Sequence, residues 1–284
     1  MTGHLDGAAV FMTGGSRGIG LAIAQRLAAV HGARVALFAK TAEPHPKLPG
    51  TLHTAAAAIE AAGGQALPIQ GDLRDAEAVQ AAVAQAAEAF GGIDVCINNA
   101  SAIDLRPVEE LPVKNYDLLQ AVNARGTYAA TQACLPHLRR SAVGHVLTLS
   151  PPLNADPRWF RHAAYTISKY GMTIVTLGVA EALRGEGVAA NCLWPQTAIA
   201  TAAVQNLLGG EEAMAGSRTP ALVADAALAV LSRPAADCTG NAYICEDVLA
   251  QEGVTDLELY AFVPGTTQFL PDFFLDHDTF VTAT

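Results

Sequence analysis

The feature of this sequence that most constrains its fold is a repeated alternation between short apolar runs and longer alanine-rich stretches. The apolar runs cover residues 8–13, 33–39, 66–70, 93–98, 145–149, 188–193 and 242–245. Helical stretches lie between them, at about 18–31, 52–62, 75–90, 115–139 and 163–183. Such alternation is typical of parallel strands joined by right-handed helical crossovers. We therefore predict a Rossmann-type, doubly wound α/β fold, with about seven parallel strands and helices on both faces of the sheet.

The length and apolar content fit one large domain. The chain has 284 residues, and 51% of them are hydrophobic, enough to cover a parallel sheet on both faces. No change in composition marks a linker, so we predict a single domain over residues 1–284. The segment from about residue 246 breaks the alternation and contains several phenylalanines among acidic residues. We expect it to be an extension that packs on the domain or on a neighbouring subunit.

The composition also excludes several classes of protein. A formal net charge of −10 disfavours nucleic acid and anionic membranes as partners. No run of about 18 apolar residues predicts a membrane span, and the N-terminus lacks the pattern of a signal peptide, so we expect a cytoplasmic protein. Five cysteines are scattered, at positions 96, 134, 192, 238 and 245. Without a C-x-x-C pair or a histidine cluster, they predict reduced thiols and no metal site.

A glycine-rich turn follows the first predicted strand and opens the first predicted helix. Glycine permits a tight turn and close approach of the backbone to a pyrophosphate, and the N-terminus of the helix offers free N–H groups. The alternative is an ordinary strand–helix connection. We predict that the diphosphate of a dinucleotide contacts Gly14, Gly15, Ser16, Arg17, Gly18, Ile19 and Gly20.

The end of the second predicted strand indicates which nucleotide binds. NAD-binding folds usually place an acidic residue there, on the 2′-hydroxyl of the ribose. This sequence instead has Lys40, with Arg17 nearby in the glycine turn. Two cations beside that ribose favour a 2′-phosphate, so NADP(H) is the preferred cofactor and NAD(H) the alternative. Both cations could equally be solvated surface charges.

Tyr165 and Lys169 form the most chemically informative pair in the sequence. Four residues apart on a predicted helix, they share one face and can converge on one site. Hydride transfer to a carbonyl leaves an oxyanion that must be protonated. A free tyrosine has a pKa near 10, which must fall by about 3, or roughly 4 kcal/mol, for work near neutral pH. A nearby ammonium and a positive nicotinamide ring favour the phenolate and would lower that pKa.

The turn T-G-x-x-x-G-x-G and the pair Y-x-x-x-K together resemble the short-chain dehydrogenase/reductase family, over most of the chain. The resemblance implies that Lys169 also hydrogen-bonds the nicotinamide ribose. It assigns Asp72 and Leu73 to the adenine pocket, and places Asn99 and Ala100 at the strand end beneath the cofactor. A polar turn is the alternative for the asparagines.

Asn123 and Ser150 are further catalytic candidates that the resemblance suggests. In the family, an asparagine in the N-x-x-G motif holds a water that links the lysine to solvent, and Asn123 matches it. The family's catalytic serine lies thirteen residues before the tyrosine, where this chain has Pro152. Proline has neither a hydroxyl nor an N–H to stabilise an oxyanion. Either Ser150, the nearest hydroxyl, moves into place or the oxyanion is held differently.

A second segment of the family contacts the nicotinamide and the pyrophosphate, and here it carries Pro195 and Thr197. Gln196 replaces the family's glycine. Three aromatic residues lie in loops or strand ends where such folds bind ligands: Trp159, Phe160 and Trp194. They are candidates to line an apolar substrate pocket. Core packing or a subunit contact is the alternative for each.

Several stretches resemble a narrower group, the hydroxysteroid dehydrogenase-like protein 2 family. They cover residues 39–48, 150–154, 164–172, 194–199 and 271–276. Members of that family can carry a C-terminal sterol-carrier domain, and this chain stops before one could fit. The resemblance implies a small, lipid-like alcohol or aldehyde as substrate.

The leading hypothesis is reversible hydride transfer between NADP(H) and an apolar alcohol, aldehyde or ketone. A second hypothesis keeps the site but changes the reaction to enoyl reduction, epimerisation or dehydration. A third is a catalytically weak sensor that binds NADP(H). The family resemblance also implies a homodimer or homotetramer.

Overall fold

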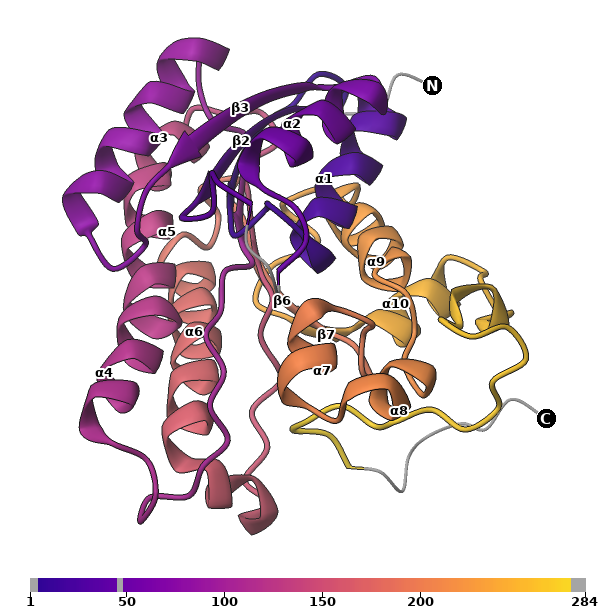
Figure 1. Ribbon diagram of the computed structural model, residues 1–284. Helices are drawn as coiled ribbons and strands as arrows, with labels where there is room; N and C mark the ends of the chain where they lie inside the picture. Colours follow the sequence, from indigo (N-terminus) through magenta and orange to yellow (C-terminus); the bar gives the residue numbers. More distant parts are fainter. Residues whose placement is uncertain (1–4, 45–47, 277–284) are drawn as a thin grey trace.

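The centre of the protein is a parallel sheet of seven strands (Figure 1). The computed structural model describes residues 5–44 and 48–276. The strands are β1 (Ala9–Thr13), β2 (Arg34–Ala39), β3 (Gln65–Gln70), β4 (Val95–Asn98), β5 (His145–Thr148), β6 (Ala189–Trp194) and β7 (Ala242–Ile244). Their order is β3-β2-β1-β4-β5-β6-β7, and every pairing is parallel. The prediction of a Rossmann-type α/β fold is confirmed.

Helices cover both faces of the sheet, which explains why its central strands are apolar along their whole length. Every residue of β1, β4 and β6 is buried. One face is covered by α1 (Gly18–His31), α2 (Leu52–Ala61), α9 (Ala221–Leu231) and α10 (Cys245–Gln251). The other is covered by α3 (Ala76–Phe90), α5 (Ala124–Leu138) and α6 (Ala163–Ala182), with α4 (Val113–Val122) alongside (Figure 1).

The long helix predicted over residues 115–139 is in fact two helices, so its predicted extent is wrong. The break falls at Asn123, whose ψ of −73° departs from the helical value of about −42°. The buried side chain of Asn123 forms hydrogen bonds outside both helices, as described below. A residue held from outside in this way changes the direction of the chain without a proline or glycine.

The chain after β6 forms short helices that the sequence did not predict. They are α7 (Ala202–Leu207) and α8 (Gly210–Ala215), and 3-10 turns also occur at η1 (Pro157–His162) and η2 (Glu258–Tyr260). The helices α9 and α10 were not predicted either. Helices of six residues or fewer are too short to display the periodicity on which such predictions depend. The chain between β6 and α9, which includes α7 and α8, borders the carboxyl end of the sheet (Figure 1).

The C-terminal part of the chain returns to the loop that follows β6. Pro271 forms an antiparallel bridge with Thr197, and the backbone N–H of Asp272 donates to the carbonyl of Gln196 at 2.9 Å. The yellow trace in Figure 1 follows this return past α8. We call residues 268–276 the C-terminal cap. The cap brings residues distant in the sequence onto the end of β6.

Candidate active site

A cavity of about 1520 Å³ opens at the carboxyl ends of β1, β2 and β4. Doubly wound folds bind their ligands in this crevice, where the order of the strands reverses. Two residues of the predicted glycine-rich turn, Gly15 and Gly20, do not line the cavity. Ten of the residues predicted to bind the cofactor do line it: Gly14, Ser16, Arg17, Gly18, Ile19, Lys40, Asp72, Leu73, Asn99 and Ala100.

The turn between β1 and α1 lies directly against the end of β4. A Cβ atom on Gly14 would lie 2.7 Å from the Cα of Ala100, and the φ of Gly14 is +74°. The side-chain amide of Asn99 donates to the carbonyl of Gly14 at 2.8 Å, and a Cβ on Gly20 would lie 2.4 Å from that amide nitrogen. Glycine is therefore required here by close approach as well as by conformation.

The N-terminus of α1 remains available to an anion. Its N-cap residue, Arg17, makes no side-chain hydrogen bond to the helix, and the first turn has no acidic residue. The free N–H groups and the helix dipole therefore face the cavity without a neutralising charge. Together with the tight turn at Gly14, this end of the helix fits the diphosphate of a dinucleotide.

The two predicted cations both border the cavity, but each has other partners. The Nζ of Lys40 lies 3.3 Å from the Oδ2 of Asp72. Hydrogen bonds from Arg74, together with Lys40, hold the pKa of Asp72 well below its ordinary value. The guanidinium of Arg17 donates to the carbonyls of Pro49 and Gly50, at 2.9 and 2.8 Å. Arg17 thus also fastens the loop before α2 to the glycine turn.

Tyr165 and Lys169 lie one turn apart on α6, and both are buried, with exposures of 5% and 2%. The Nζ of Lys169 donates to the carbonyl of Leu149 at 2.6 Å and lies 4.9 Å from the ring centre of Trp194. Burial raises the pKa of Tyr165, and burial lowers the pKa of Lys169 to about 7 against the opposing charge of Asp272. In this conformation both groups therefore favour their neutral forms.

The C-terminal cap covers this pair. The ring of Phe274 lies 5.9 Å from the ring of Tyr165, and the ring of Phe273 lies 6.4 Å from it, measured between centres. Neither Tyr165 nor Lys169 lines the cavity described above. Asp272 is half-buried, and its removal from water raises the pKa of its carboxyl to about 7 while Lys169 opposes that rise. No local sequence pattern indicated these contacts, because more than 100 residues separate Tyr165 from Phe273 and Phe274.

Asn123 is completely buried at the junction of α4 and α5. Its amide nitrogen donates to the carbonyl of Ala102 and to the hydroxyl of Ser168, both at 2.9 Å. Its amide oxygen accepts from the backbone N–H of Ala102 at 2.7 Å. Asn123 thus links the loop after β4 to α6, one residue away from Lys169.

Ser150 is buried in the loop after β5, outside the cavity lining. Its hydroxyl has no hydrogen-bond partner among the described residues. It lies near the thiol of Cys192. Burial raises the pKa of that thiol, and the hydroxyls of Ser150, Thr176 and Thr173 lower it. A hydroxyl that is buried without a partner retains its capacity to donate to another group.

The segment after β6 contains one site residue that the sequence analysis missed. Pro195 and Thr197 are both buried, and the hydroxyl of Thr197 has no partner among the described residues. Thr201, at the N-cap of α7, lines the cavity opposite the glycine turn, 3.4 Å from a Cβ built on Gly18. An N-cap threonine before a helix is a sequence signal, but no helix was predicted here.

Two further features concern the described part of the chain as a whole. None of its helices combines the length and apolarity that crossing a membrane requires. It also contains no group of three histidine, cysteine, aspartate or glutamate side chains arranged to hold a metal ion.

Comparison with known proteins identifies the family. Residues 8–211 match the family described as short chain dehydrogenase. The chain belongs to this family. Membership confirms the predicted resemblance to the short-chain dehydrogenase/reductase family.

Individual relatives support the narrower resemblance. The chain is 54% identical over 276 residues to hydroxysteroid dehydrogenase-like protein 2 of Xenopus tropicalis and 51% identical to that of Homo sapiens. Both alignments cover 97% of this chain and 65% of the relative, so the chain spans about two thirds of their length. The predicted resemblance to this group is confirmed.

Solved structures agree with this assignment. A short chain dehydrogenase from Mycobacterium thermoresistibile is 58% identical, with a TM-score of 0.90 and 96% of each chain covered. A putative dehydrogenase from Xanthomonas campestris is 51% identical, with a TM-score of 0.92, covering 96% of this chain and 99% of that one. A metagenomic short-chain oxidoreductase in complex with NADP is 28% identical, with a TM-score of 0.70, covering 85% of this chain and 97% of that one.

The close approach at Gly14 predicts the effect of Gly14→Ala on stability. The added Cβ meets the backbone of Ala100 and forces alanine into a positive φ, so the free energy of unfolding should fall by about 3 kcal/mol or more. Gly185→Ala is the matched control, because its φ is +84° and nothing lies within 4 Å of its Cβ. Urea denaturation of both variants measures the difference. Equal losses would contradict the close approach.

The burial of Asp272 predicts a dependence of stability on pH. A carboxyl whose pKa is raised in the folded state stabilises the fold below its unfolded pKa, and this contribution is lost as the pH rises through about 7. The stability of Asp272→Asn relative to the wild type should therefore increase between about pH 4 and pH 7, the span between the unfolded and folded pKa values.

Asp104→Asn provides a control of opposite sign. Hydrogen bonds from Arg106 lower the pKa of Asp104 to about 2, so its contribution is lost as the pH falls below about 4. Unfolding free energies at several pH values test both variants. A constant difference between Asp272→Asn and the wild type would mean that Asp272 is ionised throughout.

Proposed function

We propose that this protein catalyses reversible hydride transfer between NADP(H) and an apolar alcohol, aldehyde or ketone. The observation that carries the proposal is the position of Tyr165 and Lys169. Both lie on α6, where Lys169 contacts the carbonyl of Leu149 after β5 and the ring of Trp194 at the end of β6. The cavity bordered by the glycine turn opens along the same carboxyl edge of the sheet.

The residues that would hold the cofactor are those that border the cavity. The N-terminus of α1 and the turn at Gly14 fit its diphosphate, and Asp72 and Leu73 fit its adenine end. Thr201 borders the cavity on the opposite side, and Pro195 and Thr197, which do not line it, are further proposed contacts. When bound, the nicotinamide supplies or accepts the hydride, which is chemistry that no side chain provides.

The side chains move the proton. Tyr165 donates a proton to the developing oxyanion in reduction and removes it in oxidation. For this, its phenol must become more acidic than it is when covered, and contact with water and a protonated Lys169 both act in that direction. Ser150 is the proposed donor to the oxyanion because its hydroxyl has no other hydrogen-bond partner among the described residues. Asn123 is the proposed link between Lys169 and solvent.

The preference for NADP(H) rests on Lys40 and Arg17, which border the cavity while no acidic residue ends β2. A phosphate could replace Asp72 as the partner of Lys40, because Asp72 keeps its hydrogen bonds to Arg74. The relative in complex with NADP is consistent with this preference.

An apolar, lipid-like substrate agrees with the residues packed around Tyr165. They include Trp159, Trp194, Ile103 and Leu105. We further propose that residues 1–284 act as one domain, with the extension from about 246 completing the site. A cytoplasmic location and a homodimer or homotetramer complete the proposal.

Replacing the phenol tests the proposed chemistry. Tyr165→Phe removes the acid, so turnover of a carbonyl compound with NADPH should fall by about 100-fold or more. The affinity for NADPH, followed by its fluorescence, should change little. Tyr128→Phe is the control, because Tyr128 is exposed on α5. Undiminished turnover by Tyr165→Phe would contradict the proposal.

Removing a cation tests the preference for NADP(H). Lys40→Ala should weaken NADPH binding by about 10-fold, as expected for one charge-assisted contact of about 1.4 kcal/mol. Binding of NADH should change much less, since it has no 2′-phosphate. Lys114→Ala, in the first turn of α4, is the control. Equal losses for the two nucleotides would assign Lys40 a purely structural role.

A further inference from the structure

We propose that the Phe274 side chain is a displaceable occupant of the substrate pocket, and that an apolar ring or chain of the substrate binds by replacing it. The inference rests on the proposed function and deepens it by naming the chemical group that the pocket accepts. It concerns Phe274 in the C-terminal cap, a residue to which the proposed function assigns no role.

Phe274 fills a pocket made almost entirely of aromatic rings. Its side chain is 1% exposed. The distances from its ring centre are 5.2 Å to Tyr170, 5.6 Å to Trp159, 5.9 Å to Tyr165 and 6.1 Å to Trp194. One of these rings bears the proposed acid. A pocket of this lining suits a flat, apolar group of about the size of a phenyl ring.

The position of Phe274 conflicts with catalysis by Tyr165. A general acid must come within hydrogen-bond distance of the oxygen that it protonates. With the cap in place Tyr165 is 5% exposed, and the large cavity does not reach it. The space beside its ring is taken by Phe274 and Phe273. A substrate therefore reaches the phenol only after the ring of Phe274 leaves.

The backbone of Phe274 indicates that its buried position is under strain. Its φ is +73°, and no other described residue except glycine has a positive φ. This region is unfavourable for a bulky L-residue and persists only when the surrounding contacts hold it. Withdrawal of the ring would relieve that strain and offset part of the lost packing.

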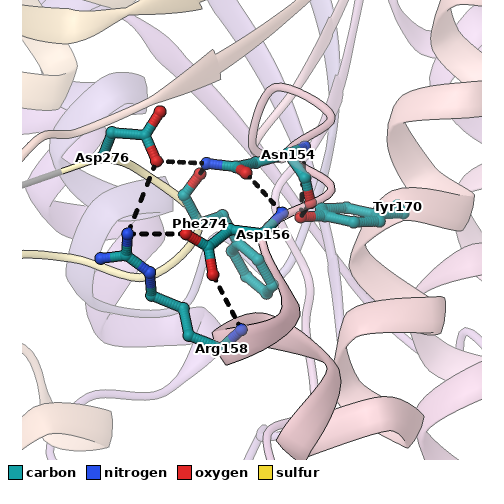
Figure 2. Close-up of polar contacts among 6 residues, drawn as sticks. All are labelled: Asn154, Asp156, Arg158, Tyr170, Phe274 and Asp276. Atoms are coloured by element: carbon teal, nitrogen blue, oxygen red, sulfur yellow. Dashed lines mark hydrogen bonds and ion pairs between the residues drawn. The ribbon is translucent and has the colours of Figure 1, made fainter.

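Figure 2 shows polar contacts among the described residues at the outer end of the cap. The amide nitrogen of Asn154 donates to the carbonyl of Phe274 and to the Oδ1 of Asp276, both at 3.1 Å. The Nη2 of Arg158 lies 3.9 Å from the same oxygen of Asp276, whose side chain is 60% exposed. Exposed ion pairs contribute little. Asn154, itself held by Tyr170, is therefore a direct polar anchor of Phe274, while the indole N–H of Trp194 donates to the carbonyl of Phe273 at 3.0 Å.

Tryptophan fluorescence reports directly on this pocket. The chain has two tryptophans, and both pack with Phe274. Asn154→Ala keeps the ring but removes its anchor, so acrylamide should quench the fluorescence about twofold more strongly, as expected for a locally opened segment. Phe274→Ala should show the same rise. Phe262→Ala, at an exposed phenylalanine, and Gln132→Ala, at a surface hydrogen bond, are the matched controls and should match the wild type.

Steady-state kinetics with NADPH test whether the ring competes with substrate. In Phe274→Ala the KM for 4-phenyl-2-butanone should fall about 5-fold, since no ring has to be displaced. If Phe274 were a fixed wall that contacts the substrate, the KM for the phenyl ketone would rise instead, and the proposal would be overturned.

The two assays separate this inference from the proposed function. Turnover with unchanged quenching in Asn154→Ala would overturn the displaceable ring and leave the oxidoreductase assignment intact. Absence of turnover in every variant would reject the proposed function. In that case, raised quenching in Asn154→Ala would still support displacement of the ring.

Discussion

The proposed catalytic half of this protein depends on the burial of two ionisable side chains in an apolar pocket. Tyr165 and Lys169 share a face of α6 beneath aromatic rings. Without water, each favours its neutral form, so burial raises one pKa and lowers the other. A neutral phenol can donate a proton, but a raised pKa makes it a weaker acid. Exposure to solvent, substrate and a positive charge is what would activate them, so control of access becomes part of the chemistry.

The nucleotide half depends on a different constraint, the contact between two backbone segments. The turn after β1 meets the end of β4 so closely at Gly14 that no side chain fits between them. Parallel strands end at one edge, so this contact, Lys169 and the loop after β6 all lie on the same side of the sheet. Asn123 connects the two halves, since it joins the loop after β4 to α6.

Much of this arrangement could be predicted from the sequence, because it depends on local patterns. The alternation of strands and helices, the glycine turn and the spacing of Tyr165 and Lys169 are signals within one or two elements. The division of the helix at Asn123 depends on hydrogen bonds from outside it, which no local pattern records. The placement of Phe274 over Tyr165 depends on a contact across about 110 positions of sequence, and aromatic composition alone did not indicate it. The orientation of Ser150 depends on the path of a loop with two prolines.

A crystal structure of the protein with NADP⁺ would test the central claim most directly. The account predicts a diphosphate on the N-terminus of α1, a 2′-phosphate beside Lys40, and a nicotinamide ring next to Tyr165. A nucleotide bound elsewhere, or a nicotinamide ring out of contact with Tyr165 and Lys169, would contradict it.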